Sequence, residues 1–168
     1  MLEITERAFV VNSFSKYFGM TGWRIGWLVA PLDAVPELEK LAQNFFISVS
    51  APAQYAALAA FDADTQRICR ERRDEFGRRR DYLLAQLRRL GFAIPHTPAG
   101  AFYLYAGIDA LAADGEAFCL NLLEQHGVAI TPGTDFGSHR ASAHVRFAYT
   151  TEQARLEEAV SRIEKSLR

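Results

Sequence analysis

A long amphipathic segment, residues 64–90, limits the folds open to this chain more than any other feature of its sequence. Apolar side chains recur through it at the spacing of one helix face, and Gly91 follows as a residue that commonly ends helices. The apolar positions are Ile68, Phe76, Leu83, Leu84, Leu87 and Leu90. The pattern predicts one long helix, and we expect the boundary between two parts of the chain beside it, between residues 62 and 63.

The same segment is rich in arginine, with nine arginines from Arg67 to Arg89. Such a density is one property of nucleic-acid-binding surfaces, but acidic residues alternate with these arginines. The whole chain carries 19 basic and 20 acidic residues, a formal net charge of -1. This balance favours a solvated helix face with salt bridges and gives no electrostatic reason to expect nucleic acid or an acidic membrane as a partner.

Apolar runs and turn residues predict the elements around this helix. Residues 8–11 and 25–30 are apolar runs bounded by polar, glycine or proline residues, which indicates buried strands of a parallel or mixed sheet. A hydrophobic content of 49% is enough for a core. The other predicted elements are helices over 32–42, 52–60 and 115–125, strands near 92–94, 102–105, 128–130 and 144–149, and a closing helix begun by a capping box of Thr150 and Gln153.

Cysteine usage and the apolar runs bear on the cellular setting. Cys69 and Cys119 lie far apart without metal-ligand spacing, which disfavours a disulfide scaffold and a zinc site and favours a reducing compartment. No apolar run reaches the length of a membrane span, and the N-terminal residues lack the apolar core of a secretory signal. We therefore expect a cytoplasmic protein with no membrane partner and no bound metal.

One lysine has a setting that suggests chemistry. Only three of the 19 basic residues are lysines, and Lys16 lies in an aromatic loop between the first two predicted strands, with Ser13, Ser15 and Arg24 nearby in sequence. A desolvated amine close to another cation loses its proton more readily and can attack an aldehyde. Hydroxyls and a guanidinium suit a phosphate. An aldehyde and a phosphate on one small ring describe pyridoxal 5'-phosphate, although a lysine taken alone is more often a surface residue.

Four segments together resemble one protein family. Residues 13–26 read SFSKYFGMTGWRIG and resemble the lysine-attachment signature of the class I and II aminotransferases, which are fold-type I pyridoxal-phosphate enzymes. Residues 98–103, PAGAFY, resemble a stretch at the start of the family's small domain. Residues 132–137, PGTDFG, resemble a turn of the family, and residues 145–149, VRFAY, resemble the strand whose arginine holds the substrate α-carboxylate. The resemblance covers essentially the whole chain.

The resemblance implies roles for five residues. Lys16 would bind pyridoxal phosphate as an internal aldimine and then move the proton between the substrate's α-carbon and the cofactor. Ser13 and Arg24 would bind the cofactor phosphate, with Ser15 as a third contact, and Arg146 would pair with the substrate α-carboxylate. Structural alternatives stay open at this point. The serines could satisfy a turn, Arg24 could form a structural ion pair, and Arg146 could be an exposed strand arginine.

The resemblance also implies a fold and a reaction. The fold would be α/β, the C-terminal part of the fold-type I transferase fold, with residues 1–62 ending the large cofactor-binding domain and residues 63–168 forming the interdomain helix and the small domain. A complete family member is more than twice this length. The reaction would transfer an amino group from an L-amino acid of aspartate, alanine or aromatic type to a 2-oxo acid, in a homodimer. A catalytically silent association module and the aminotransferase-like half of a transcription regulator are the alternatives.

Overall fold

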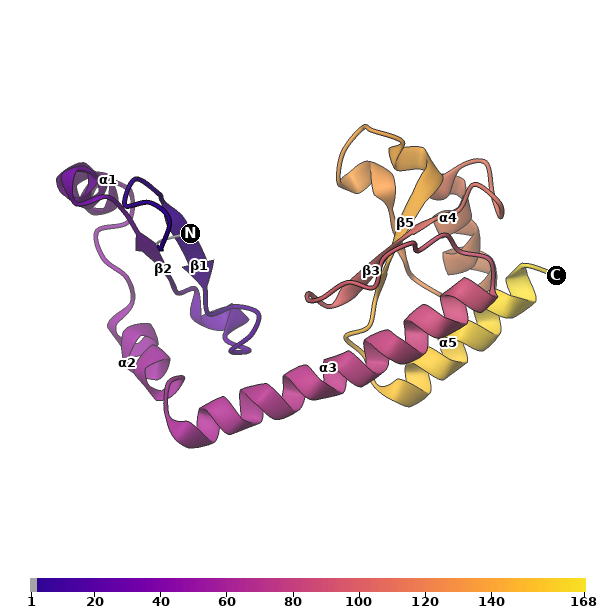
Figure 1. Ribbon diagram of the computed structural model, residues 1–168, viewed down its shortest axis with the longest axis horizontal. Coiled ribbons are helices and arrows are strands. Elements are labelled where there is room, and N and C mark those ends of the chain that lie inside the picture. The colour runs from indigo at the N-terminus through magenta and orange to yellow at the C-terminus, as the bar shows by residue number, and fades with distance from the viewer. Residues whose placement is uncertain (1–2) are drawn as a thin grey trace. The chain divides into compact units, whose positions relative to one another are not determined.

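The computed structural model describes residues 3–168, which form two compact units divided between Arg73 and Asp74. Helix α3 (Ala63–Arg89) is continuous and contributes to both units, and Figure 1 shows it as one uninterrupted helix. The long helix predicted from the apolar spacing is therefore confirmed. The contact boundary lies inside α3, whereas we expected it before the helix began. The assignment of residues 1–62 and 63–168 to a large and a small domain stays a prediction.

The first unit contains a two-stranded sheet and two α-helices. Strand β1 (Val10–Ser13) pairs antiparallel with β2 (Gly26–Val29), and the register places Val10 opposite Val29 and Ser13 opposite Gly26. Helix α1 (Val35–Phe45) follows a short 3-10 turn, and α2 (Ala51–Ala59) begins with Pro52 in its first turn. The predicted helices at these positions are confirmed, with a shift of a few residues at their ends.

The prediction of buried strands in a parallel or mixed sheet is wrong for the residues that the structure describes. Strands β1 and β2 pair only with each other, in antiparallel sense, and most of their side chains are exposed. A strand that is apolar on both faces needs a covering layer on each side. The buried residues around this sheet are few: Phe14, Met20, Ala57 and Ala60.

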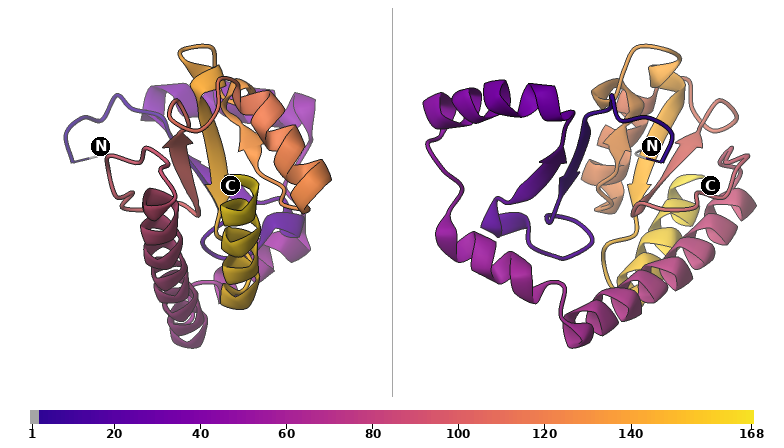
Figure 2. Two further views of the ribbon diagram at one scale, coloured as in Figure 1. Left: turned by 90° about the vertical axis from the view of Figure 1, so that its right-hand side faces the viewer. Right: turned by 60° about the vertical axis from the view of Figure 1, so that its left-hand side comes forward.

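The second unit is an antiparallel sheet with helices packed against it. Its strands are β3 (Tyr103–Gly107), β4 (Thr131–Pro132) and β5 (His144–Ala148), in the order β3-β5-β4. Helix α4 (Gly115–His126) begins where the Asp114 carboxylate accepts hydrogen bonds from the backbone, and it ends at Gly127 in the left-handed conformation. Helix α5 (Gln153–Ser166) lies beside the C-terminal half of α3 (Figures 1 and 2).

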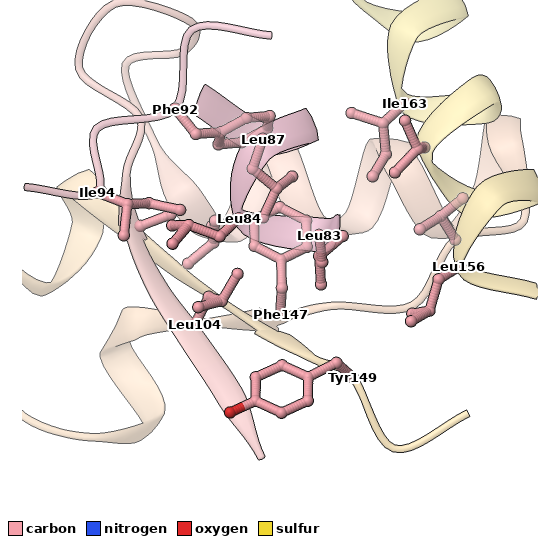
Figure 3. Packing of buried hydrophobic residues seen from close by; sticks show 14 of the residues in the cluster. Leu83, Leu84, Leu87, Phe92, Ile94, Leu104, Phe147, Tyr149, Leu156 and Ile163 are labelled. Carbon is pink, nitrogen blue, oxygen red and sulfur yellow. The ribbon is translucent and has the colours of Figure 1, made fainter. Parts of the chain in front are cut away.

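The core of the second unit lies between the sheet and helices α3, α4 and α5. Leu87 of α3, Leu104 of β3 and Ile163 of α5 are almost completely buried. Figure 3 shows these side chains converging around Phe147. The apolar stripe predicted for the long helix is therefore confirmed over its C-terminal half, where Leu83, Leu84 and Leu87 are buried. The wide apolar contact fixes the sheet on these helices.

The arginines of α3 form the solvated, salt-bridged face that the sequence predicted. Arg67 pairs with Glu71 at 2.8 Å, and Glu75 accepts from both Arg78 and Arg79. Other arginines tie the helix to the chain that follows it. The guanidinium of Arg88 donates twice to the carbonyl of Ile94, at 2.9 and 2.7 Å. These backbone contacts were not predicted.

Three smaller predictions about the second unit are wrong. Residues 92–94 make only one isolated bridge, Ala93 to Gly107, and residues 128–130 precede β4 without forming a strand. No capping box opens α5, because the residue before the helix is Glu152, so Thr150 lies too far from the first turn. The Gln153 amide donates instead to Glu157, at 3.0 Å.

Candidate functional site

The loop between β1 and β2, residues 14–25, is folded back on itself by backbone hydrogen bonds. The Phe14 amide donates to the Ile25 carbonyl, and the Met20 amide donates to the Phe14 carbonyl, both at 3.1 Å. Within this frame the Gly19 amide donates to the Lys16 carbonyl at 3.0 Å, and Gly19 has a positive φ of 68°. Lys16 therefore begins a tight turn whose position is set by the strands on either side.

Aromatic packing anchors the loop. Phe14 is 5% exposed and lies 4.9 Å, between ring centroids, from both Phe18 and Trp27. Phe61, just beyond α2, contacts Phe14 and Phe18 at 5.8 Å. Contacts of this kind fix ring orientation as well as bury area. These ring contacts hold the loop in place, while its polar side chains lie at the surface.

The predicted phosphate ligands of this loop are joined by one chain of hydrogen bonds. The Ser13 hydroxyl donates to the Ser15 hydroxyl at 2.9 Å and accepts from the Ser15 amide at 3.0 Å. The Thr21 hydroxyl donates to the Ser15 carbonyl at 2.7 Å, and the Arg24 guanidinium donates to the Thr21 carbonyl at 3.0 Å. Thr21 therefore connects the serines to Arg24, a role that the sequence reasoning missed.

The strand register forces Ser13 and Arg24 toward the same end of the sheet. Gly26 lies opposite Ser13, and a Cβ on Gly26 would come within 2.5 Å of the Asn12 carbonyl oxygen. Only glycine allows the two strands to approach this closely. Arg24, which precedes β2, adopts the left-handed conformation with φ of 51°. A non-glycine residue seldom takes this conformation without a local reason, and such residues concentrate at functional sites.

Lys16 differs from the sequence expectation in one respect. The sequence predicts a desolvated, apolar setting for this amine, but the side chain of Lys16 is exposed among the described residues. The aromatic residues next to Lys16 in sequence do not bury it, because Phe14 and Phe18 pack against each other and Tyr17 is 44% exposed. The hydrogen-bonded hydroxyls of Ser13 and Ser15, together with the Arg24 guanidinium on the same loop, are donors that fit a phosphate. The described residues thus fit the phosphate of pyridoxal phosphate but do not by themselves bury the lysine.

Arg146 lies at the centre of the sheet in the second unit. It is on β5, directly opposite Tyr105 of β3 and Thr131 of β4. Its guanidinium carbon lies 4.5 Å from the ring centroid of Phe136 and 5.4 Å from that of Tyr103. The side chain is half-buried, so Arg146 is not the exposed strand arginine of the alternative interpretation.

The guanidinium of Arg146 is only partly hydrogen-bonded by the described residues. Nη2 donates to the Thr131 hydroxyl at 3.3 Å, whereas Nε is buried and has no hydrogen-bond partner among residues 3–168. The aromatic side chains around it were not assigned from the sequence. Side chains alternate along a strand, so Tyr103 and Tyr105 lie on one face of the sheet. This alternation could have predicted aromatic neighbours on that face.

The residues of the loop and Arg146 belong to different units. Ser13, Ser15, Lys16 and Arg24 lie in the first unit, and Arg146 lies in the second. Among residues 3–168 no group of three or more His, Cys, Asp or Glu side chains could hold a metal ion. No helix of the described part is long and apolar enough to cross a membrane.

Comparison with known proteins identifies the family. The sequence profile described as aminotransferase class I and II matches residues 2–163. The chain belongs to the class I and II aminotransferase family. A valine–pyruvate aminotransferase of Mycobacterium tuberculosis is 38% identical over 161 residues, which are 96% of this chain and 42% of that protein. The (5-formylfuran-3-yl)methyl phosphate transaminase of Methanocaldococcus jannaschii is 36% identical over 98% of this chain and 43% of that protein.

Solved structures of aminotransferases share the backbone of this chain. An aminotransferase from Mycobacterium tuberculosis superposes with a TM-score of 0.94 at 39% identity, over 99% of this chain and 43% of that one. An aromatic aminotransferase from Pyrococcus horikoshii superposes with a TM-score of 0.88 at 34% identity, over 95% of this chain and 42% of that one. The expected α/β fold, the C-terminal part of the fold-type I transferase fold, is confirmed.

The relatives and solved structures that this chain resembles are aminotransferases. The chain spans about two fifths of the length of the curated relatives that it matches. What those longer proteins do is therefore a starting point for a proposal about this chain.

Proposed function

We propose that this chain carries the lysine and the substrate-carboxylate site of a pyridoxal-phosphate-dependent aminotransferase. The reaction would move an amino group from an L-amino acid of aspartate, alanine or aromatic type to a 2-oxo acid. One observation carries the proposal beyond family membership. The hydrogen-bond chain from Ser13 through Ser15 and Thr21 to Arg24 gathers hydroxyl and guanidinium donors on the loop that presents Lys16.

In this proposal the loop binds the cofactor through its phosphate. Ser13, Ser15 and Arg24 donate hydrogen bonds to the phosphate oxygens, and the positive charge of Arg24 balances the charge of the phosphate. The turn closed by the Gly19 amide holds the lysine beside these donors. When bound, pyridoxal phosphate supplies an aldehyde and an electron-withdrawing ring, the chemistry that no side chain of the protein offers.

Lys16 then has two tasks at its Nζ atom. As a nucleophile it would hold the aldehyde group of the cofactor. It would also hold and move the proton of the substrate α-carbon, which is general acid–base catalysis by one group.

Arg146 is proposed to bind the α-carboxylate of both substrates. A guanidinium offers two parallel N–H donors to a carboxylate, which fixes the orientation of the substrate as well as its charge. Within residues 3–168, Arg146 Nη2 donates to the Thr131 hydroxyl, and the other Nη hydrogens remain as donors for a ligand. An ammonium group would supply the charge without the planar geometry.

The proposal is tested by titrating the chain with pyridoxal phosphate and following its visible absorbance. Borohydride reduction and peptide mapping then identify the modified lysine. We expect saturable binding with the label on Lys16, and no saturable signal from Lys16→Ala. Lys40→Ala is the matched control, because Lys40 is an exposed lysine of the same unit that pairs with Glu37. Weak label spread over Lys16, Lys40 and Lys165 would contradict the proposal.

Two further properties belong to the same proposal. Members of the family commonly form homodimers, so we propose that the chain associates with a second copy, which sedimentation over a range of concentrations tests. A clean monomer at all concentrations would contradict it. A cytoplasmic location is proposed with it, and expression of a tagged chain followed by fractionation tests that location.

A further inference from the structure

The guanidinium of Arg146 is flanked by two rings, those of Tyr103 and Phe136, which we call the aromatic clamp. Tyr103 lies on β3, while Phe136 lies in the segment after β4, so the rings come from different parts of the chain. The guanidinium carbon is 4.5 Å from the Phe136 centroid and 5.4 Å from the Tyr103 centroid. Both distances are within the range of favourable cation–π contact.

Arg146 differs from most arginines of the chain in its partners. Many arginines of the described residues pair with carboxylates, including Arg79 with Glu75 and Arg162 with Glu158. Arg146 pairs with none of the described carboxylates, and its contacts are two rings and one hydroxyl. Its positive charge is therefore stabilised by groups that do not neutralise it. A cation held in this way keeps its attraction for an incoming anion.

The burial of Nε limits the direction from which an anion can approach. Nε is buried and has no hydrogen-bond partner in the part of the chain that the structure describes, so a carboxylate cannot reach that edge of the guanidinium without displacing protein atoms. Nη2 already donates one hydrogen bond to Thr131. The edge between Nη1 and Nη2 therefore remains, where each nitrogen can donate one hydrogen bond to a carboxylate.

We propose that Phe136 and Tyr103 are positioning residues that fix the plane of Arg146, so that it receives the substrate carboxylate end-on through Nη1 and Nη2. This inference rests on the proposed function of Arg146. Of the two rings, that of Phe136 is closer to the guanidinium, so replacing it should disturb Arg146 more. The side chain of Phe136 is also 49% exposed. It can therefore be changed without opening the core.

The test uses the 168-residue chain labelled with ¹⁵N-arginine, titrated with pyruvate as the carboxylate probe. In the wild-type chain we expect the Nε–H signal of Arg146 to be shifted upfield by the neighbouring rings and to exchange slowly with water. Pyruvate should bind with saturation and perturb the Nη signals more than the Nε signal. Arg146→Gln assigns the signal and removes the binding.

Phe136→Leu should remove the upfield shift, speed the exchange of the Nε proton and weaken pyruvate binding by roughly three- to tenfold, whereas Phe136→Tyr should restore both properties. Phe46→Leu is the control, because Phe46 is 57% exposed and lies in the other unit. Thermal unfolding of each variant checks that the fold is intact.

The outcomes separate the two proposals. If Phe136→Leu binds pyruvate as tightly as the wild-type chain, with Arg146 still required, the positioning role is overturned and the carboxylate role of Arg146 stands. If wild-type binding does not depend on Arg146, the carboxylate role fails, and the positioning role falls with it. If the largest pyruvate-induced change is at Nε, the end-on geometry is overturned.

Discussion

Thr131 and Arg146 lie directly opposite each other on β4 and β5, and the threonine hydroxyl accepts a hydrogen bond from Arg146 Nη2 at 3.3 Å. The strand register therefore supplies the polar partner of Arg146, while the rings of Phe136 and Tyr103 supply its flanks. Strand pairing is rigid compared with a loop, so the position of this hydroxyl follows from the sheet itself.

Thr131→Val tests this relationship with a side chain of nearly the same shape. The variant leaves Nη2 without its acceptor, and we expect pyruvate affinity to fall by about two- to fivefold, corresponding to about 0.5–1 kcal/mol for one lost hydrogen bond. Isothermal titration or the NMR titration above measures the change. Thr151→Val, at an exposed threonine of the same unit, should leave the affinity unchanged. Equal affinities for Thr131→Val and the wild-type chain would contradict a positioning role for this hydroxyl.

Gly26→Ala should disrupt the lysine loop, which is the loop of residues 14–25 that carries Lys16. The added Cβ would lie 2.5 Å from the Asn12 carbonyl oxygen, which is backbone and cannot turn away. Either β2 moves away from β1 or the Ser13–Gly26 register shifts, and overpacking of this kind costs about 1–3 kcal/mol. We expect the borohydride-trapped label on Lys16 to decrease strongly.

Gly22→Ala is the matched control for that experiment. Gly22 lies in the same loop, and a Cβ there meets no atom within 4 Å. Labelling of Lys16 should stay at the wild-type level in this variant. Equal labelling of both alanine variants would show that the close strand approach at Gly26 does not shape the loop.

The thiol of Cys119 should resist alkylation until strongly alkaline pH. Burial, followed by the carboxylates of Asp135, Asp114 and Glu116, raises the pKa of this thiol from 9.0 to about 11. Because the folded pKa is above the unfolded one, this group contributes stability that is fully present below pH 9 and lost as the pH rises through about 11.

Iodoacetamide rates between pH 8 and 11.5, resolved by peptide mass spectrometry, measure this. The native chain should show a half-maximal rate for Cys119 near 11, and the urea-unfolded chain should show one near 9. A native profile centred on the unfolded value would mean that the carboxylates and burial do not act on this thiol.

Hydrogen exchange should differ between the two units. The sheet of the second unit packs Leu104, Val145 and Phe147 into a large buried cluster, whereas β1 and β2 contribute no buried side chain. Local opening is therefore easier in the first unit, and we expect its strand amides to exchange much faster than those of β3 and β5. Mass spectrometry of exchanged peptides makes the comparison. Equal protection of both sheets would contradict it.

The long helix shows what the sequence predicts well. Apolar positions at helical spacing, with Leu83, Leu84 and Leu87 in register, depend only on local geometry, and Gly91 ends the pattern one residue beyond Leu90. The loop between the first two strands was also predicted, because its residues are continuous in sequence, whereas the roles of its residues stay predictions. Both features are contained in short stretches of the chain.

The environment of Arg146 was not predictable in the same way. Phe136 and Tyr103 reach the guanidinium from separate segments, and their meeting depends on the antiparallel register of three strands. The burial of β1 and β2 was wrong for a related reason. An apolar run indicates that a strand is covered in some assembly, but it does not say whether the covering atoms belong to the same 168 residues.

The two-stranded sheet of the first unit has a consequence for how the chain behaves among other polypeptides. Among residues 3–168, β1 and β2 have no strand neighbour on their outer sides, so each presents a row of main-chain donors and acceptors. Their sequences, VVNS and GWLV, contain neither the lysine nor the proline with which edge strands usually discourage pairing. An extended segment of another polypeptide can lengthen this ladder by main-chain hydrogen bonds alone. The loop that carries Lys16 is therefore joined to a two-stranded sheet whose outer edges can accept a further strand.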